Sequence, residues 1–180
     1  MKIIFAYGST RPASASQKLL DAMASSARAA GHTVLRYSLT ENLNGCHGCA
    51  ACRKGAGNCV QKDALAGYFD ELFTADHLVV SAPIYMGQPA GQTISFMNRH
   101  YCLKDSAKQN RLPAGKKVTL VFAQGAEAGY PAYRPVHEWL MNSFVRYGFE
   151  PGESKVIGGD SDLSPAGALA AWAAAWGRSL

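Results

Sequence analysis

The sequence predicts an α/β protein in which a five-stranded parallel sheet lies between two layers of helices. Short apolar runs alternate with helical patterns along the whole chain, which gives five strand–helix units in series. Such alternation is typical of parallel sheets that are covered on both faces. The first run is continuously apolar, as expected for a strand buried on both sides. We expect one domain over residues 1–180, because a chain of this length buries a sizeable core.

The elements of the first half follow from apolar spacing and from residues that start or stop helices. The predicted elements are a strand at Lys2–Tyr7, a helix at residues 16–30 that Gly31 ends, and a strand at residues 33–37. A long irregular stretch follows at residues 38–62. Asp63 is then placed to cap a helix whose apolar face is formed by Leu65, Tyr68, Phe69, Leu72 and Phe73.

The second half continues the alternation. The predicted elements are strands at residues 77–82, at Lys117–Ala123 and at Lys155–Ile157, and helices at residues 92–103 and 135–147. Pro83 follows the third strand, and Gly148 ends the helix before the last strand. Ser164 and Pro165 open a final helix, with proline at the first helical position.

Doubly wound sheets bind ligands beyond the carboxyl ends of their strands, where the strand order reverses. The loops after the first, third and fourth strands are therefore the candidate ligand loops, and they begin at Gly8, Pro83 and Gln124.

The first of these loops has the chemistry of a phosphate site. Ser9, Ser14 and Ser16 offer hydroxyl groups and Arg11 offers a charged fork, next to the start of the first helix. Free N–H groups and the positive dipole end at a helix start both favour a phosphate. The endings typical of nucleoside-triphosphate loops and of dinucleotide loops are absent. The structural alternative is a serine-rich capping loop without a ligand.

The second loop suits a flat ring. Tyr85 and Met86 offer an aromatic plane and a polarizable edge, and backbone groups near Gly87 are available to the rim of such a ring. The structural alternative is ordinary packing in a tight turn.

The run Gly8-Ser9-x-Arg11-x-x-Ser14-x-Ser16 resembles the FMN-phosphate loop of the NADPH-dependent FMN reductase family. Pro83-Ile84-Tyr85 resembles the second FMN loop of that family, and Arg99 matches its following helix, whereas Ile94 and Asn98 depart from it. The resemblance implies a flavodoxin-like three-layer sandwich with strand order 2-1-3-4-5. It also implies an FMN site formed by Ser9, Arg11, Ser14, Ser16, Gln17, Pro83, Ile84, Tyr85, Met86, Gly87, Gln124 and Gly125.

Four cysteines form the most distinctive local motif. Cys46, Cys49, Cys52 and Cys59 follow the spacing C-x2-C-x2-C-x6-C, which suits the corners of one cubane cluster. The spacing resembles the iron–sulfur flavoprotein subgroup, which implies one [4Fe–4S] cluster here. Two alternatives stay open: a folded loop without metal, since many related reductases share the pattern through residues 57–63, and a zinc site. Cys102 lies outside the run and is expected to be a buried or surface thiol.

The resemblance implies an FMN-dependent oxidoreductase that passes electrons from NAD(P)H to flavin, a quinone or another small acceptor, as a homodimer or homotetramer. Because FMN would supply the chemistry, we expect no catalytic side chain. One alternative is an iron–sulfur flavoprotein electron carrier that links a ferredoxin-like donor to FMN; another is a protein that kept the fold and lost the flavin.

The charge and hydropathy of the chain limit its partners. The net charge of +5 argues against a small acidic shuttle, and the basic stretch at residues 99–117 is expected to be a solvated face. No nucleic-acid motif accompanies that stretch, and no apolar run is long enough to span a membrane. We therefore expect a cytoplasmic protein with neither a nucleic-acid nor a membrane partner.

Overall fold

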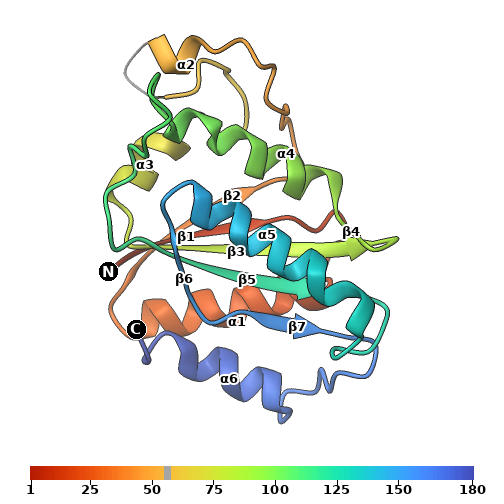
Figure 1. Ribbon diagram of the computed structural model, residues 1–180. Helices are drawn as coiled ribbons and strands as arrows, with labels where there is room; N and C mark the ends of the chain where they lie inside the picture. Colours follow the sequence, from red (N-terminus) through yellow and green to blue (C-terminus); the bar gives the residue numbers. More distant parts are fainter. Residues whose placement is uncertain (55–57) are drawn as a thin grey trace.

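The computed structural model describes residues 1–54 and 58–180, and a parallel sheet forms its middle layer (Figure 1). Four strands lie in the order β2-β1-β3-β5. They are β1 (Lys2–Tyr7), β2 (Thr33–Ser38), β3 (His77–Tyr85) and β5 (Lys117–Ala123). All three pairings between them are parallel.

The fifth position of the sheet is occupied by two short strands. β6 (Glu150–Pro151) and β7 (Lys155–Ile157) both pair with β5 in parallel, at its start and at its end. Between them the chain leaves the regular ladder, and the hydroxyl of Ser154 accepts the Leu120 N–H at 3.1 Å. The predicted order 2-1-3-4-5 is therefore confirmed, with the fifth strand divided in two.

Helices cover both faces of the sheet, as Figure 1 shows. On one face lie α1 (Ala15–Ala29) and α6 (Ala168–Trp176), and on the other lie α3 (Tyr68–Thr74), α4 (Gly91–Arg99) and α5 (Arg134–Arg146). The remaining short pieces are β4 (Gln88–Pro89), α2 (Ala51–Lys54) and the 3₁₀ turns η1 (His100–Leu103) and η2 (Pro131–Tyr133). No described helix is long and apolar enough to cross a membrane.

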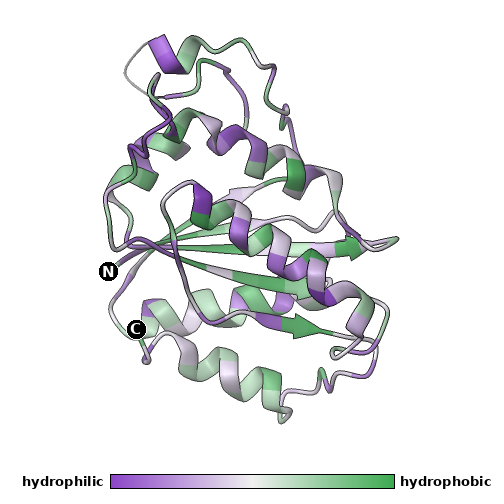
Figure 2. Cartoon of the chain, viewed as in Figure 1, coloured by the Kyte–Doolittle hydropathy of each residue, from purple (hydrophilic) through white to green (hydrophobic). Residues whose placement is uncertain are grey.

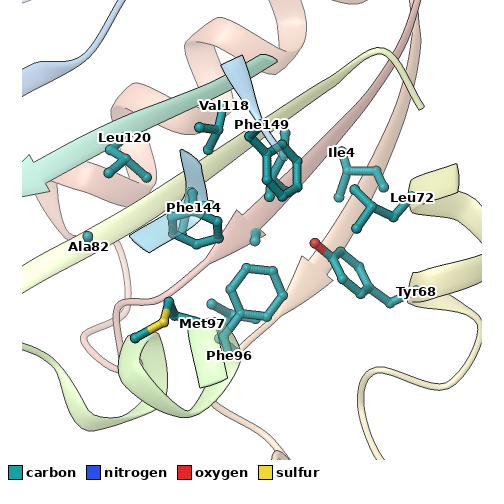
Figure 3. Close-up of a cluster of buried hydrophobic side chains, with 14 of the residues drawn as sticks. Ile4, Tyr68, Leu72, Ala82, Phe96, Met97, Val118, Leu120, Phe144 and Phe149 are labelled. Carbon is teal, nitrogen blue, oxygen red and sulfur yellow. The ribbon is translucent and has the colours of Figure 1, made fainter. Parts of the chain in front are cut away.

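The apolar strands produce a core on each side of the sheet. Successive residues of β1 point to opposite faces, so Ile3 and Phe5 pack with α1 and α6, whereas Ile4 belongs to the cluster under α3, α4 and α5. Figure 3 shows that second cluster, where Tyr68, Phe96 and Phe144 close over the sheet. Figure 2 shows hydrophobic residues along the central strands. The continuous apolar runs in the sequence have this double burial as their cause.

The helix expected to begin at Asp63 begins at Tyr68, so that the capping prediction is wrong. Gly67 precedes α3 in the left-handed region, with φ of 76°, which stops a helix from extending further toward the N-terminus. Asp63 instead accepts the backbone N–H groups of Asn44 and Leu65, each at 3.0 Å, and pairs with Arg99. The Asp63 carboxylate, which the local sequence predicted to cap a helix, forms a long-range ion pair with Arg99 instead.

The start of the last helix also differs from the prediction. The helix α6 begins at Ala168 rather than at Ser164 and Pro165. The carboxylate of Asp162 accepts the Ser164 N–H at 2.8 Å, and Gly167 N–H donates to the Ser164 carbonyl at 3.0 Å. These bonds hold a turn at the position where the helix was expected.

Candidate functional site

A cavity of about 400 Å³ lies where the carboxyl ends of β1, β3 and β5 meet. We call it the strand-end cavity. It is lined by Ser9, Arg11, Ser14, Ala15, Ser16, Pro83, Ile84, Tyr85, Ala123, Gln124, Gly125, Ile157, Gly158 and Leu163. Three loops that are far apart in the sequence therefore form one site, at the position expected for a doubly wound sheet.

Nine of the twelve residues predicted to form the site line this cavity, and Gln17, Met86 and Gly87 do not. Five residues that the sequence analysis missed also line it: Ala15, Ala123, Ile157, Gly158 and Leu163. The pair Gly158-Gly159 after the last strand was a usable signal, because it has the form of a further loop at the same sheet edge.

Gly8 brings the first loop against β3. A Cβ at this position would overlap the Ser81 carbonyl oxygen and would lie 2.9 Å from Thr93 Oγ1. The residue is therefore glycine because of this close approach of two chain segments, which fixes where the loop leaves the sheet.

The helix that follows the first loop has a defined start. Ser14 is the N-cap of α1, and its hydroxyl accepts the Gln17 N–H at 3.3 Å. The first turn of α1 carries no acidic residue, so no carboxylate competes for the positive end of the helix. The Ser16 side chain is buried and its hydroxyl lies 3.3 Å from that of Ser14. This end of the cavity offers hydroxyls, free amides and the Arg11 guanidinium.

The second loop is the hairpin between β3 and β4. Met86 and Gly87 form its two-residue turn, with φ of 50° and 76°, as type I′ hairpins require. The Met86 side chain is 98% exposed, so it points to solvent instead of forming a wall of the cavity. Tyr85 lines the cavity and is 47% exposed, which places its ring at the mouth.

Gln124 supplies the most specific polar group of the wall. Its Nε2 donates to the Glu127 carbonyl at 2.7 Å, which fixes the orientation of the amide. Its Oε1 is buried and has no hydrogen-bond partner among residues 1–54 and 58–180. A buried acceptor without a donor is costly, so this atom is suited to receive an N–H group of a ligand.

The loop after β7 packs against the third loop. A Cβ at Gly158 would overlap the Ala128 amide nitrogen, and the Asp160 carboxylate accepts the Ala128 N–H at 2.7 Å. The third and last loops therefore support each other at the same rim of the strand-end cavity.

The strand-end cavity has little acid–base chemistry of its own. In the described part of the chain, its lining contains no histidine, cysteine, lysine or carboxylate. Such a wall is suited to bind and orient a ligand.

The four cysteines of the motif line a second, smaller space of about 20 Å³, which we call the cysteine cavity. Cys46 and Cys49 are exposed and Cys52 and Cys59 are half-buried. Burial, followed by the other three cysteines, raises the pKa of Cys52. Residues 55–57, which fall inside the motif, are outside the described residues.

Cys102 closes the cysteine cavity from the side of η1. It is 1% exposed, and burial raises the pKa of its thiol to about 12. The thiol is therefore protonated. Of the two alternatives expected from the sequence, a buried or a surface thiol, the structure shows the buried one, and it places Cys102 next to the four cysteines of the motif.

Arg99 lies in the wall of the cysteine cavity with its side chain only 1% exposed. Burial alone would raise the pKa of Asp63, but hydrogen bonds from Arg99 and from the Asn44 and Leu65 amides hold it below its usual value. Lys116 is also buried and donates to the Ala75 carbonyl at 2.5 Å. The basic stretch at residues 99–117 is therefore not a uniform solvated face.

The donor set of the cysteine cavity is formed by the four thiols of the motif, the ligand type of an iron–sulfur cluster. Within the described residues, no three His, Cys, Asp or Glu side chains are arranged to hold one metal ion. In a cubane each cysteine binds a different iron, so the thiolates stand farther apart than around one ion. Cys46, Cys49, Cys52 and Cys59 would hold such a cluster.

Comparison with known proteins shows which family and which relatives this chain resembles. The profile of the family described as NADPH-dependent FMN reductase matches residues 1–141. An iron–sulfur flavoprotein of Methanosarcina thermophila is 28% identical over 143 residues, which cover 78% of this chain and 73% of that protein. One of Methanocaldococcus jannaschii is 26% identical over 122 residues, and this match spans 66% of the present chain but only 61% of the relative's length.

The solved structures that resemble this chain share its fold. An NAD(P)H:quinone oxidoreductase from Methanothermobacter marburgensis superposes with a TM-score of 0.75 at 14% identity, over 99% of this chain and 98% of that one. Oxidised flavodoxin 1 from Bacillus cereus gives a TM-score of 0.64 at 12% identity, over 99% and 95% of the two chains.

Proposed function

The chain belongs to the NADPH-dependent FMN reductase family, and from this premise we propose that it binds FMN in the strand-end cavity and uses NAD(P)H to reduce flavin, a quinone or another small acceptor. The observation that carries the proposal is the polarity of that cavity. Hydroxyls, free amides and Arg11 come from the loop after β1, whereas Tyr85 and Gln124, with its unpartnered oxygen, come from the ends of β3 and β5. This division matches a phosphomonoester joined to a flat ring that carries N–H groups.

The residues of the cavity would hold the cofactor without taking part in bond making. Ser9, Ser16 and the amides at the start of α1 would bind the phosphate, and Arg11 would add a charged hydrogen bond. Gln124 would accept an N–H of the ring, and Pro83, Ile84 and Ala123 would exclude water from it. FMN, when bound, supplies the hydride and electron chemistry. The half-exposed Tyr85 leaves the mouth open to a nicotinamide and then to an acceptor.

The first test separates phosphate binding from ring binding. Arg11→Gln should weaken FMN binding about tenfold, because a hydrogen bond to a charged group contributes about 1.5 kcal/mol or more. The same variant should leave riboflavin binding unchanged, since riboflavin has no phosphate. Quenching of flavin fluorescence measures both. Arg28→Gln, at the other end of α1, is the matched control. Equal losses for FMN and riboflavin, or no FMN binding by the wild type, would overturn the proposed site.

The second test concerns the reaction. FMN-loaded protein should oxidise NADH or NADPH when a quinone or free flavin is present, which the loss of nicotinamide absorbance follows. If neither nucleotide is oxidised under any of these conditions, the reductase proposal fails even where FMN binds.

A second candidate function is electron transfer between a [4Fe–4S] cluster in the cysteine cavity and FMN, with a ferredoxin-like protein as donor. It is supported by the four thiols around one cavity and by the two iron–sulfur flavoprotein relatives. Iron and acid-labile sulfide in anaerobically purified protein would favour this candidate, and NAD(P)H oxidation without them would favour the reductase.

We also expect a homodimer or homotetramer, because Tyr85, Met86 and Tyr130 expose apolar surface near the strand-end cavity. Light scattering on the FMN-loaded protein tests this expectation. The five free cysteines, none of which is in a disulfide, are consistent with a reducing compartment such as the cytoplasm.

A further inference from the structure

Three hydrogen bonds from its two terminal nitrogens hold the Arg99 side chain. Its Nη1 donates to the Asn44 carbonyl at 2.9 Å and also bonds Asp63 Oδ2, and its Nη2 donates to Asp63 Oδ1 at 3.3 Å. Its Nε–H is buried and has no hydrogen-bond partner among the residues described. Because Arg99 lines the cysteine cavity, this buried Nε–H is a donor that the wall of the cavity can offer to a bound group.

The same side chain joins the two ends of the cysteine motif. Asn44 lies just before Cys46, and Asp63 lies just after Cys59. Besides pairing with Arg99, the Asp63 carboxylate accepts the Asn44 N–H at 3.0 Å. Gln61 repeats the connection, since its Nε2 donates to the Gly45 carbonyl at 3.0 Å. Arg99 is the last residue of α4, so its side chain attaches both ends of the cysteine loop to that helix.

The chemistry of the cavity indicates what the free N–H would meet. Cys59, one of the four motif cysteines, lines the same cavity as Arg99. The acceptors that a bound cluster would add on this side are thiolate and sulfide sulfurs. Hydrogen bonds to such sulfurs stabilise the more negative, reduced state of a cluster and raise its potential.

We propose that Arg99 is a positioning residue for the cysteine site: it fixes both ends of the cysteine loop and donates its Nε–H to a sulfur atom of the cluster held there. This inference rests on the proposed iron–sulfur site. The Asp63 carboxylate neutralises the buried positive charge of Arg99. Arg99 would therefore act on the cluster through the hydrogen bond of its Nε–H and not through a net charge.

The test uses the full chain, reconstituted without air with iron and sulfide. Arg99→Lys keeps the positive charge beside Asp63 but removes the Nε–H. Arg53→Lys is the matched control: Arg53 is in the same loop, but its guanidinium donates to Tyr101 and to the Asp105 and Ser106 carbonyls, and it does not line the cysteine cavity. Arg99→Lys should lower the midpoint potential of the cluster and leave that of FMN unchanged, and Arg53→Lys should shift neither.

A measurement on the wild type covers the case in which Arg99→Lys fails to fold. Protein labelled with ¹⁵N at the arginine Nε should show a nitrogen coupling to the reduced cluster in pulsed electron paramagnetic resonance, and Arg53→Lys should retain it.

The outcomes distinguish the two proposals. Absence of the coupling from cluster-loaded wild type, or an unchanged cluster potential in folded Arg99→Lys, overturns the role of Arg99 and leaves the iron–sulfur site intact. Absence of iron and sulfide from reconstituted wild type overturns both, while FMN binding stays a separate question.

Discussion

Gly8 shows at the scale of one residue how the first loop depends on space. A methyl group at this position would overlap the Ser81 carbonyl oxygen, which belongs to a buried strand and has little freedom to move. We expect Gly8→Ala to lower the free energy of unfolding by about 1–3 kcal/mol, in the range of other overpacked sites. Chemical denaturation measures this change.

Gly91 is the control for that substitution. No atom lies within 4 Å of the Cβ that Gly91→Ala would add at the first residue of α4. This variant should keep wild-type stability or gain up to about 1 kcal/mol. Similar losses for both variants would mean that close packing is not the reason for glycine at position 8.

Individual residues also show what the sequence could and could not predict about the site. Ser9, Arg11 and Gln124 were found because they follow predicted strands. Met86 was assigned to the wall because of its type, but the hairpin turn points it outward. Asp63 was assigned to a helix cap from its local sequence. Its ion-pair partner Arg99 lies 36 residues away, so no local pattern could predict the pair.

The last helix, α6, packs closely against α1 through a hydrogen bond and a close approach of the two backbones. The Ser26 hydroxyl donates to the Ala174 carbonyl at 2.7 Å, and a Cβ at Gly177 would overlap the Ala27 backbone. Trp176, which is 3% exposed, packs its ring edge-to-face with Phe5 at 5.9 Å. These contacts make α6 part of the core on its face of the sheet.

Trp176→Ala should therefore cost about 3–5 kcal/mol of unfolding free energy, as for other large aromatic side chains removed from cores. Trp139→Ala serves as the control, since Trp139 is 46% exposed and should change stability by about 0.5 kcal/mol. Equal effects in urea titrations would contradict the assignment of α6 to the core.

The bounds of two long strands were predicted more accurately than the starts of α3 and α6. Lys2–Tyr7 and Lys117–Ala123 have the predicted bounds, because continuous apolar runs are set by burial on both faces. Lys155–Ile157 also has them, whereas β3 extends to Tyr85, beyond the predicted end at residue 82. The starts of α3 and α6 lie later than predicted. Each depends on a turn in front of the helix, and such turns are set by hydrogen bonds that apolar spacing does not encode.

Two buried histidines make the stability of the whole molecule depend on pH. His77 contacts Trp176 on one face of the sheet, and His100 lies among Phe96 and Phe144 on the other. Burial lowers the pKa of both from 6.5 to about 4. The unfolded chain therefore binds protons below pH 6.5 that the native protein does not take up until about pH 4.

Unfolding free energy should accordingly fall as the pH is lowered through this window, by up to about 2 kcal/mol for each histidine between pH 6.5 and pH 5. Urea titrations at several pH values measure the slope. His100→Gln should reduce the slope, because it removes one of the two buried imidazoles. Equal stability at pH 7 and pH 5 would contradict the prediction.

A single domain is predicted to unfold as one unit. The two cores share one sheet, so we expect the chain to unfold in one cooperative transition. Tryptophan fluorescence, which reports on Trp176, and far-ultraviolet circular dichroism should give coincident curves. Separate midpoints would indicate two independent units.

The fastening of the cysteine loop to Arg99 has a consequence for protein engineering. The described residues between β2 and α3 contribute no strand to the sheet, so this segment could be exchanged as a cassette between flavin-binding proteins in a chimera. Its anchor, however, is encoded on α4, far downstream of the cassette. A graft that transfers residues 39–67 without an arginine at the end of the recipient's fourth helix should give a loosely attached loop, and one that transfers both should not.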